Sequence, residues 1–278
     1  MSRQNSNNAG HKARKRFGQN FLQDQGVIRR IIRGVSPRTT DHMVEIGPGL
    51  GALTEVILDE AGALDAIELD RDLLPILRAK FFNYEEKFRI FEADAMKFDF
   101  SSLQQDDRPL RIIGNLPYNI STQLIFHLLQ HTTCVQDMHF MLQKEVVDRL
   151  AAKPGDKLYG RLGIMAQYYC EIEPLFIVPP EAFDPIPKVD SAIVRLMPYK
   201  NKPLVAKDLP TLQKIVKISF SMRRKTLRNN LKNTVTGEQL EALNIDPTRR
   251  PETLSLAEFI CIADFVHTNI TLLPSATP

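Results

Sequence analysis

The stretch Met43-Val44-Glu45-Ile46-Gly47-Pro48-Gly49-Leu50-Gly51 joins a short apolar run to three glycines at alternate positions. The apolar run is typical of a buried strand, and the residues from Leu50 to Glu60 have the spacing of a helix. Glycines between a strand and a helix permit a tight turn and let a ligand approach the main chain closely. The stretch therefore predicts the start of an α/β domain with a ligand-binding loop.

Strand-like and helix-like segments continue to alternate around this stretch. An amphipathic helix is expected before it, from Asp24 to Val35. Beyond it we expect, in order, a strand, a helix, two strands, a helix and a strand, at residues 63–69, 72–82, 88–93, 111–116, 121–130 and 138–143. A β-like run at Ser191–Leu196 could close the sheet. This alternation indicates an α/β fold with a doubly wound, mostly parallel sheet.

The composition changes at Pro198–Pro210, and the residues that follow show helical periodicity with little strand character. We therefore predict a basic N-terminal arm, an α/β domain and a small all-helical domain, at residues 1–23, 24–200 and 201–278.

The overall composition is that of an ordinary soluble globular protein, with 278 residues, 43% of them hydrophobic and 25% charged. No apolar run approaches the length of a membrane span, so no membrane partner is expected, and the polar, basic start is unlike a secretory signal. The three cysteines are far apart and include no CxxC pair. This pattern favours a reducing, cytoplasmic location.

The net charge is only +3, but two basic blocks, at residues 1–23 and 209–237, contain no acidic residue. Such blocks are either footprints for a polyanion or solvated, solubilising faces. The candidate RNA-binding residues within them are Lys12, Arg14, Lys15, Arg16, Arg223, Arg224, Lys225 and Arg228.

The glycine loop has three possible roles. Gly47-x-Gly49-x-x-Ala52 satisfies a dinucleotide-binding fingerprint, with Glu68 suited to a ribose hydroxyl, and it could also be a purely structural turn. However, Glu45 completes a pattern that resembles motif I of S-adenosylmethionine-dependent methyltransferases, and an acid suits a cationic methyl donor better than a pyrophosphate. Asp94 follows the next strand and could accept from a cofactor adenine, although a capping role is equally consistent.

Asn115-Leu116-Pro117-Tyr118 follows a later strand, at the edge where open α/β sheets bind ligands. The Asn115 side-chain oxygen and a main-chain carbonyl of Leu116 or Pro117 could accept both hydrogens of an aromatic amine, which would free its lone pair for methylation. Tyr118 could stack on the base, which is worth roughly 1–3 kcal/mol. A structural turn is the alternative, but the preceding Glu68 and Asp94 favour the catalytic role.

The segment Phe183-Asp184-Pro185-Ile186-Pro187-Lys188 surrounds one aromatic residue with prolines. One hypothesis is that Phe183 stacks on the target base opposite Tyr118. The alternative is that Phe183 fills part of the hydrophobic core.

Five segments together resemble the ribosomal RNA adenine dimethyltransferases, most closely their bacterial small-subunit (16S) branch. They are Lys12–Leu22, Glu45–Gly51, Asn115–Ser121, Phe183–Ser191 and Arg223–Leu231. The resemblance extends from residue 12 to about residue 232. It implies a Rossmann-like class I methyltransferase domain followed by a small C-terminal helical domain.

The resemblance also implies a reaction and its participants. The cofactor would be S-adenosyl-L-methionine, and the product N(6),N(6)-dimethyladenosine at two adjacent adenosines in a loop near the 3′ end of 16S rRNA. The partner would be this RNA within the assembling small (30S) subunit, with no metal and with the chain acting as a monomer. The implied cofactor contacts include Asn20, Leu22, Gly47, Glu68, Asp94 and Asn115, and the glycine loop adds Gly49 and Gly51.

Other classes of function fit less well. His127 and His131 have one metal-ligand spacing, but no further ligand is evident and they flank an apolar helical face. A large-subunit methyltransferase, a non-catalytic assembly factor and a nicotinamide-dependent oxidoreductase are the remaining alternatives. The last would need a hydride-transfer acid or base that is not apparent.

Overall fold

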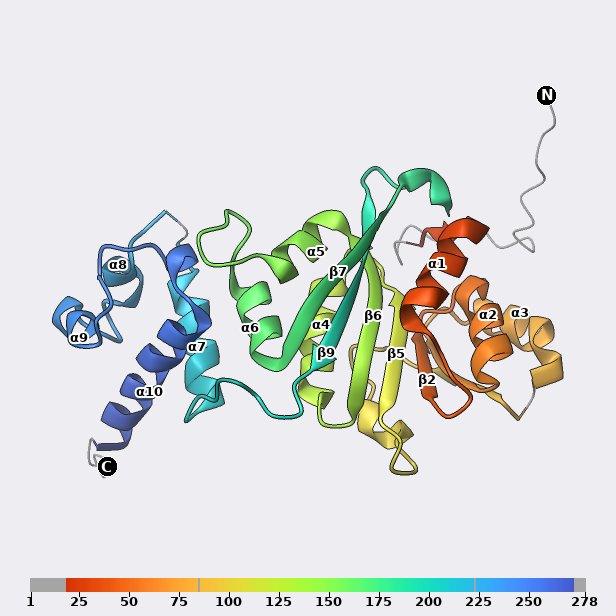
Figure 1. Ribbon diagram of the computed structural model, residues 1–278, viewed down its shortest axis with the longest axis horizontal. Helices are drawn as coiled ribbons and strands as arrows, with labels where there is room; N and C mark the ends of the chain where they lie inside the picture. Colours follow the sequence, from red (N-terminus) through yellow and green to blue (C-terminus); the bar gives the residue numbers. More distant parts are fainter. Residues whose placement is uncertain (1–18, 85, 223, 273–278) are drawn as a thin grey trace. The chain divides into compact units, whose positions relative to one another are not determined.

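A seven-stranded sheet forms the centre of the N-terminal part of the chain in the computed structural model, which describes residues 19–84, 86–222 and 224–272 (Figure 1). The strand order is β4-β3-β2-β5-β6-β9-β7. In chain order the strands are β2 (His42–Ile46), β3 (Leu64–Glu68), β4 (Phe88–Glu92), β5 (Leu110–Asn115), β6 (Val135–Gln143), β7 (Cys170–Val178) and β9 (Ser191–Pro198). The strands from β4 to β6 pair in parallel, and β9 is antiparallel to β6. The predicted mostly parallel sheet is confirmed.

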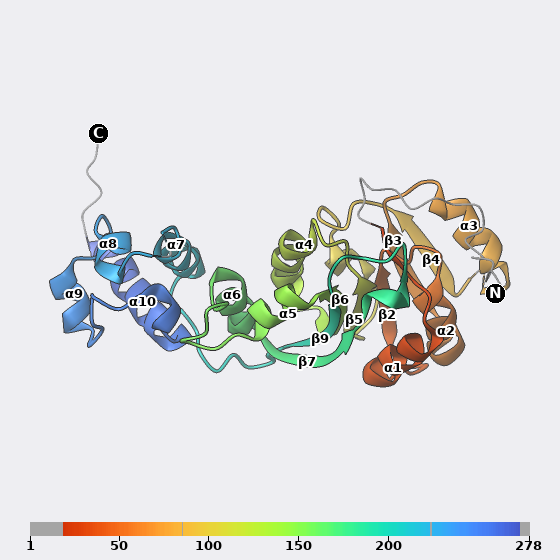
Figure 2. The ribbon, with the colours of Figure 1, turned by 90° about the horizontal axis from the view of Figure 1, so that it is seen from above.

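Helices cover both faces of this sheet. In Figure 2, α1 and α2 lie on one side and α4 on the other. The helices that accompany the strands are α1 (Gln25–Val35), α2 (Ala52–Ala61), α3 (Leu73–Lys80), α4 (Ser121–Leu128) and α5 (Lys144–Ala151). The buried face of α1 joins residues of α2 and α3 in one hydrophobic cluster. The strand-helix alternation expected from the sequence is therefore present, with bounds shifted by a few residues.

Contacts between residues divide the chain into two compact units. The first unit extends to Val147 and includes Ile172–Pro198, and the second consists of Asp148–Glu171 and the residues from Tyr199 onward. Sequence patterns assign 148–171 to the first domain; this segment holds helix α6 (Arg161–Tyr169). Strand β7, which also escaped sequence prediction, contains Pro174 and two glutamates and lies at the sheet edge, where proline is tolerated.

The second unit is helical. Its remaining helices are α7 (Leu209–Ser219), α8 (Leu227–Leu231), α9 (Gly237–Ala242) and α10 (Leu256–Leu272). Asp208 caps α7 by accepting from the amide of Thr211 at 2.8 Å, and α7 packs against α10. Short 3₁₀ turns occur in the chain at Phe82–Tyr84, Phe100–Leu103, Leu129–His131, Pro180–Ala182 and Pro251–Thr253.

Buried charges link the strands to the end of α1. The Arg111 guanidinium on β5 donates to the Asp137 carboxylate on β6, with Nη2–Oδ2 at 2.8 Å, and to Asp41 Oδ2 at 2.6 Å. It also donates, at 2.7 Å, to the carbonyl of Val35, which is the last residue of α1. Because the guanidinium satisfies main-chain and carboxylate acceptors together, it fixes the end of α1 relative to the sheet.

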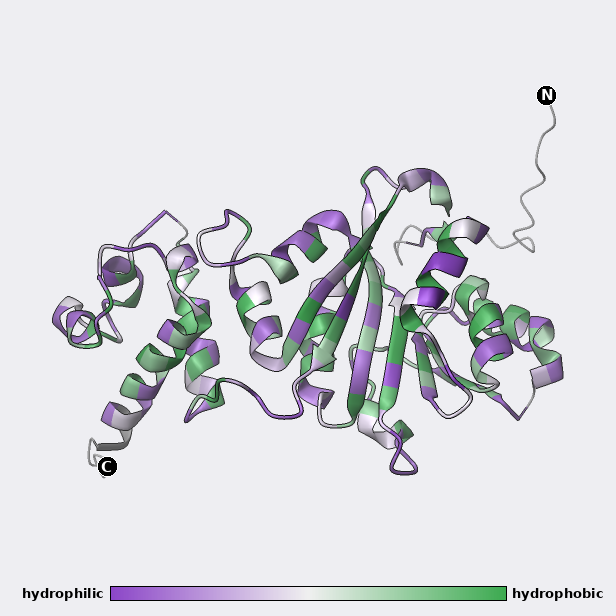
Figure 3. Cartoon of the chain, viewed as in Figure 1, coloured by the Kyte–Doolittle hydropathy of each residue, from purple (hydrophilic) through white to green (hydrophobic). Residues whose placement is uncertain are grey.

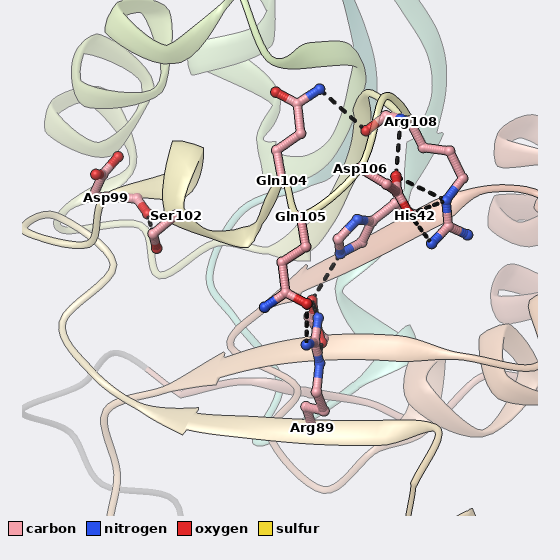
Figure 4. Close-up of polar contacts among 9 residues, drawn as sticks. His42, Arg89, Asp99, Ser102, Gln104, Gln105, Asp106 and Arg108 are labelled. Carbon is pink, nitrogen blue, oxygen red and sulfur yellow. Dashed lines mark hydrogen bonds and ion pairs between the residues drawn. The ribbon is translucent and has the colours of Figure 1, made fainter.

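A second polar cluster lies at the amino ends of β2, β3 and β4 (Figure 4). His42 Nε2 is 2.8 Å from Asp65 Oδ2, and Arg89 approaches the same carboxylate with two nitrogens at 2.5 Å each. A ligand is expected at the carboxyl ends of these strands, which lie on the opposite side of the sheet from this cluster. The cluster therefore pairs the strands without entering the expected ligand site.

Replacing Arg111 with Met should lower the free energy of unfolding by about 3–5 kcal/mol, because it leaves the nearly buried Asp137 carboxylate unpaired. Urea denaturation followed by circular dichroism measures this loss. The control is Arg108→Met, which breaks the exposed pair with Asp106 and should have a far smaller effect. Equal losses for the two variants would contradict a structural role for the Arg111 network.

Candidate functional site

A cavity of about 1090 Å³ opens at the carboxyl ends of β2, β3 and β5. Most of the residues predicted to bind a cofactor or a target base line it: Asn20, Leu22, Gly47, Gly49, Glu68, Asp94, Asn115, Leu116, Pro117 and Tyr118. Of the residues predicted to bind the cofactor or the target base, Gly51 and Phe183 are not in this lining. Segments almost a hundred residues apart, such as those of Asn20 and Asn115, thus meet at the carboxyl ends of these strands.

The glycine loop has the left-handed backbone that favours glycine. The φ angles of Gly47, Gly49 and Gly51 are 67°, 59° and 79°. A Cβ at Gly49 would stand 3.1 Å from the Phe21 ring, and one at Gly51 would stand 2.6 Å from the Phe81 ring. Gly51 therefore serves the turn and the packing of α2, whereas Gly47 and Gly49 expose main chain to the cavity.

Glu68 ends β3 with its carboxylate held in place. Its Oε1 accepts from the amide of Asp70 at 2.7 Å, and its Oε2 is 3.4 Å from the amide of Gly49. Burial raises the pKa of Glu68, and these amide donors oppose that rise. The remaining lone pairs can accept hydroxyl donors, as the proposed ribose contact requires.

Glu45 lies deeper in the same cavity. It is only 2% exposed, and Thr54 Oγ1 donates to its Oε2 at 2.6 Å. Burial raises the pKa of Glu45 to about 7, although the Thr54 hydrogen bond lowers it. A cationic ligand in this cavity would favour the ionised carboxylate, so the site fits the positively charged methyl donor.

Asp94 lies after β4, where both of its predicted roles are possible. Its Oδ1 accepts from the amide of Met96 at 3.0 Å, which makes it the acid of a turn. Asp94 also lines the cavity, and its carboxylate has further acceptor positions for a ligand. The proposed contact with a cofactor adenine stays a prediction.

The end of β5 presents acceptors. Asn115 Nδ2 donates to the carbonyl of Asn20 at 2.9 Å, which leaves its Oδ1 as an acceptor in the cavity lining. The carbonyl of Pro117 already accepts from the amides of Ile120 and Ser121, at 3.2 and 3.1 Å. Of the two main-chain carbonyls considered from the sequence, that of Leu116 is therefore the better candidate for a substrate contact.

Tyr118 is anchored through a residue to which the sequence assigns no role. Its hydroxyl is 2.6 Å from Oγ of the fully buried Ser191 on β9. Burial raises the pKa of Tyr118, so the ring is neutral at physiological pH. Ser191 closes the segment that carries Phe183, but its partner lies 73 residues away, and only the tertiary structure reveals the contact.

Phe183 is a core residue in this structure. It is 3% exposed, pairs with Leu22 in the two-stranded sheet of β1 (Phe21–Leu22) and β8 (Phe183–Asp184), and belongs to the main hydrophobic cluster. This arrangement favours the second of its two predicted roles. Its neighbour Asp184 lines the cavity instead.

The predicted RNA contacts are partly described. Arg224, Lys225 and Arg228 are exposed in the second unit, at and before α8. The other candidate RNA-binding residues lie outside the described residues: Lys12, Arg14, Lys15, Arg16 and Arg223. RNA binding by either block stays a prediction.

The histidines set aside as metal ligands have ordinary packing contacts. His127 Nε2 is 2.8 Å from the carbonyl of Phe98, and its ring meets that of His131 edge-on. Over the described part of the chain, no group of three potential metal-ligating side chains comes together. None of the described helices combines the length and apolar character needed to cross a membrane.

Comparison with known proteins gives consistent results. Residues 10–268 match the family model described as Ribosomal RNA adenine dimethylase. The chain is 63% identical over 267 residues to the ribosomal RNA small subunit methyltransferase A of Hahella chejuensis, covering 96% of this chain and 97% of that protein. It is 65% identical over 261 residues to the protein of the same name from Marinobacter nauticus, covering 94% of each.

A solved structure supports the fold. The chain resembles the crystal structure of a dimethyladenosine transferase from Plasmodium falciparum with a TM-score of 0.73 and 27% identity, over 87% of this chain and 95% of that one. Together with the observed sheet, this likeness confirms the predicted class I methyltransferase fold with C-terminal helices.

The affinity for S-adenosylmethionine should rise between pH 6 and 7.5, by at most about eightfold, because Glu45 loses its proton over this range and then attracts the cation. Isothermal titration calorimetry measures the affinity. Glu45→Gln should bind more weakly at pH 7.5 and show a flatter profile, whereas the exposed Glu60→Gln should behave as the unaltered protein.

In the free protein, the raised pKa of Glu45 makes stability change with pH in the direction opposite to the affinity. Since burial favours the neutral acid, the contribution of Glu45 to stability falls as the pH rises from about 4.5 to about 7. Glu45→Gln should remove this fall in the absence of the ligand. An unchanged affinity profile in Glu45→Gln would show that another group causes the pH dependence.

Proposed function

This chain belongs to the ribosomal RNA adenine dimethylase family, and we propose that it transfers methyl groups from S-adenosylmethionine to two adjacent adenosines of 16S rRNA. The adenosines lie in a loop near the 3′ end of the RNA, and the product is N(6),N(6)-dimethyladenosine. The observation that carries the proposal is the orientation of Asn115, whose side-chain oxygen is left as an acceptor in the cavity lining.

The small-subunit substrate is supported by the relatives. Two proteins more than 60% identical to this chain over at least 94% of their own length are named ribosomal RNA small subunit methyltransferase A. The fuller match of Phe183–Ser191 and Arg223–Leu231 to that branch argues in the same direction, against a large-subunit enzyme. A loop adenosine is also an accessible target, because it is already partly unstacked and is less costly to flip out than one in a duplex.

The donor-binding part of the cavity fits the cofactor. S-Adenosylmethionine supplies an electrophilic methyl group on a positively charged sulfur. In this proposal Glu68 accepts from its ribose hydroxyls and Asp94 from its adenine amino group; both residues line the cavity. Gly47 and Gly49 allow close approach of the ligand to the main chain. Glu45 contributes negative charge to the cavity when it is ionised, although burial raises its pKa to about 7.

The acceptor-binding part addresses the weak nucleophilicity of an aromatic amine. Asn115 Oδ1 and the Leu116 carbonyl each accept one hydrogen of the adenine amine, which turns the nitrogen lone pair away from the ring and toward the methyl group. Tyr118 supports the base by stacking, with its hydroxyl held by Ser191. Alignment for in-line displacement then provides much of the rate acceleration.

Proton removal needs no strong base in this arrangement. Forming the new nitrogen–carbon bond places positive charge on the amine, which makes its proton acidic. The acceptors that oriented the amine also stabilise this charge until the proton passes to solvent. Rotation about the bond to the ring would bring the second hydrogen into position for a second transfer.

The cellular setting follows from the substrate. We infer that the chain acts in the cytoplasm on the assembling 30S subunit, as a monomer, with the basic blocks contacting phosphates. Exposed Arg224, Lys225 and Arg228 support this role, since phosphate contacts position an RNA without specifying its sequence.

The proposal is tested by incubating the protein with labelled S-adenosylmethionine and small subunits that lack the modification. Digestion and mass spectrometry should reveal N(6),N(6)-dimethyladenosine at two adjacent positions. Asn115→Ala should lower the rate by at least about 10²-fold, as expected for loss of an aligned acceptor. The exposed Asn83→Ala is the matched control. Unmodified adenosines after incubation with the unaltered protein would overturn the proposal.

Ser191→Ala should lower kcat by roughly 2–10-fold while leaving the KM for S-adenosylmethionine unchanged, because Tyr118 loses the hydrogen bond that fixes its ring. Single-turnover kinetics with saturating subunits measures this effect. Tyr118→Phe removes the same bond and should not add to the loss.

A matched control separates this effect from general destabilisation. Ser219→Ala changes another fully buried serine, whose hydroxyl has no partner among the described residues, and should leave kcat unaltered. Additive losses in the Ser191→Ala, Tyr118→Phe double variant would refute a role for this hydrogen bond in positioning.

A further inference from the structure

The exposed side of α1 carries positive charges that belong to neither basic block. Arg29, Arg30 and Arg33 lie in the helix and Arg38 follows it, and all four are exposed. In Figure 3, hydrophilic stretches alternate with hydrophobic ones along the α1 ribbon. These four residues are called the α1 arginine face below.

The stability of α1 does not explain these arginines. The helix is held by its opposite side, where Ile28, Ile31 and Ile32 enter the hydrophobic core, and by Asp24, which caps its first turn. The helix contains no acidic residue, so Arg29 and Arg33, four residues apart, repel each other. Arg33 alone gains from its place in the last turn, where the helix dipole favours a cation.

The charges are also not neutralised by neighbours. Elsewhere, arginines such as Arg71, Arg108 and Arg249 pair with carboxylates. Within residues 19–84, 86–222 and 224–272, no carboxylate forms an ion pair with the α1 arginine face. Asp41, the nearest acid in sequence to Arg38, is engaged by the Arg111 guanidinium and by the Arg38 amide.

One member of the face is preorganised. The Arg30 guanidinium stacks over the Phe176 ring of β7, with its central carbon 4.0 Å from the ring centroid. Stacking restricts the side chain but leaves the N–H groups at the edge of the guanidinium plane free to donate. A planar fork of this kind suits the oxygens of a phosphate group.

The face begins next to the ligand cavity. Gln23 and Gln25, at the amino end of α1, belong to the cavity lining. Because a helix rises 1.5 Å per residue, Arg29 and Arg33 lie about 6 and 12 Å along the axis from Gln25. A strand leaving the cavity in this direction would pass both side chains.

We propose that the α1 arginine face binds phosphates of the ribosomal RNA strand that flanks the target adenosines. This inference rests on the proposed function and adds an RNA contact within the first unit. An RNA strand fits better than a protein partner, because the exposed positions between the arginines include no large apolar side chain that could anchor a protein. Unneutralised guanidinium groups match a polyanion.

The test is the double variant Arg29→Gln, Arg33→Gln, compared with Arg78→Gln, Lys87→Gln, which removes the same charge from exposed positions on α3 and before β4. Binding to unmethylated small subunits and to unmodified 16S rRNA is measured at several salt concentrations. The α1 variant should bind both more weakly, and its plot of log affinity against log salt should be shallower by about 1.4–1.8. The control should retain the slope of the unaltered protein.

Two results would overturn the inference. One is an unchanged slope and affinity for the α1 variant. The other is weaker binding to subunits with unchanged binding to naked RNA, which would point to a ribosomal protein. The single-turnover methylation rate at saturating subunits should be unaffected by either variant. Failure of the unaltered protein to methylate subunits would refute the proposed function separately, since the binding measurements do not depend on turnover.

Discussion

The hydrogen bond from Asn115 Nδ2 to the Asn20 carbonyl, 2.9 Å long, is the contact on which the site depends. An amide has one donor end and one acceptor end, so engaging the nitrogen leaves the oxygen to receive a hydrogen from the substrate. The same bond connects the end of β5 to the segment that precedes β1. The Asn115 side chain therefore both joins two walls of the cavity and orients its own oxygen as an acceptor.

The surrounding structure keeps this contact in place. Parallel pairing of β2, β3 and β5 brings the glycine loop, Glu68 and Asn115 to one edge of the sheet. The Arg111 network ties β5 to β6 and to the end of α1. Strand β9 then supplies Ser191, which holds Tyr118 beside the acceptors. Charged pairs near the amino ends of the strands thus stabilise the sheet, while the carboxyl ends of the strands form the ligand cavity.

Much of the fold could be predicted because its signals are local. The period of apolar residues revealed the strands and helices from 24 to 143. The three alternate glycines, which have positive φ in the structure, indicated the loop after β2. Prediction failed at β7, where Pro174 and glutamates interrupt the alternation, and did not detect α6. An edge strand contributes fewer buried positions, so its sequence carries a weaker pattern.

The sequence alone determined the residue types that meet in the cavity, because a glycine turn, an acid at the end of β3 and the Asn115–Tyr118 segment each need particular side chains at fixed spacing. Only the tertiary structure decided which atoms remain available to a ligand. It engaged the Pro117 carbonyl in α4, buried Phe183 in the core, and paired Tyr118 with Ser191. Hydrogen bonds between residues far apart in the chain occupy particular donors and acceptors. Which groups they occupy cannot be read from the local sequence.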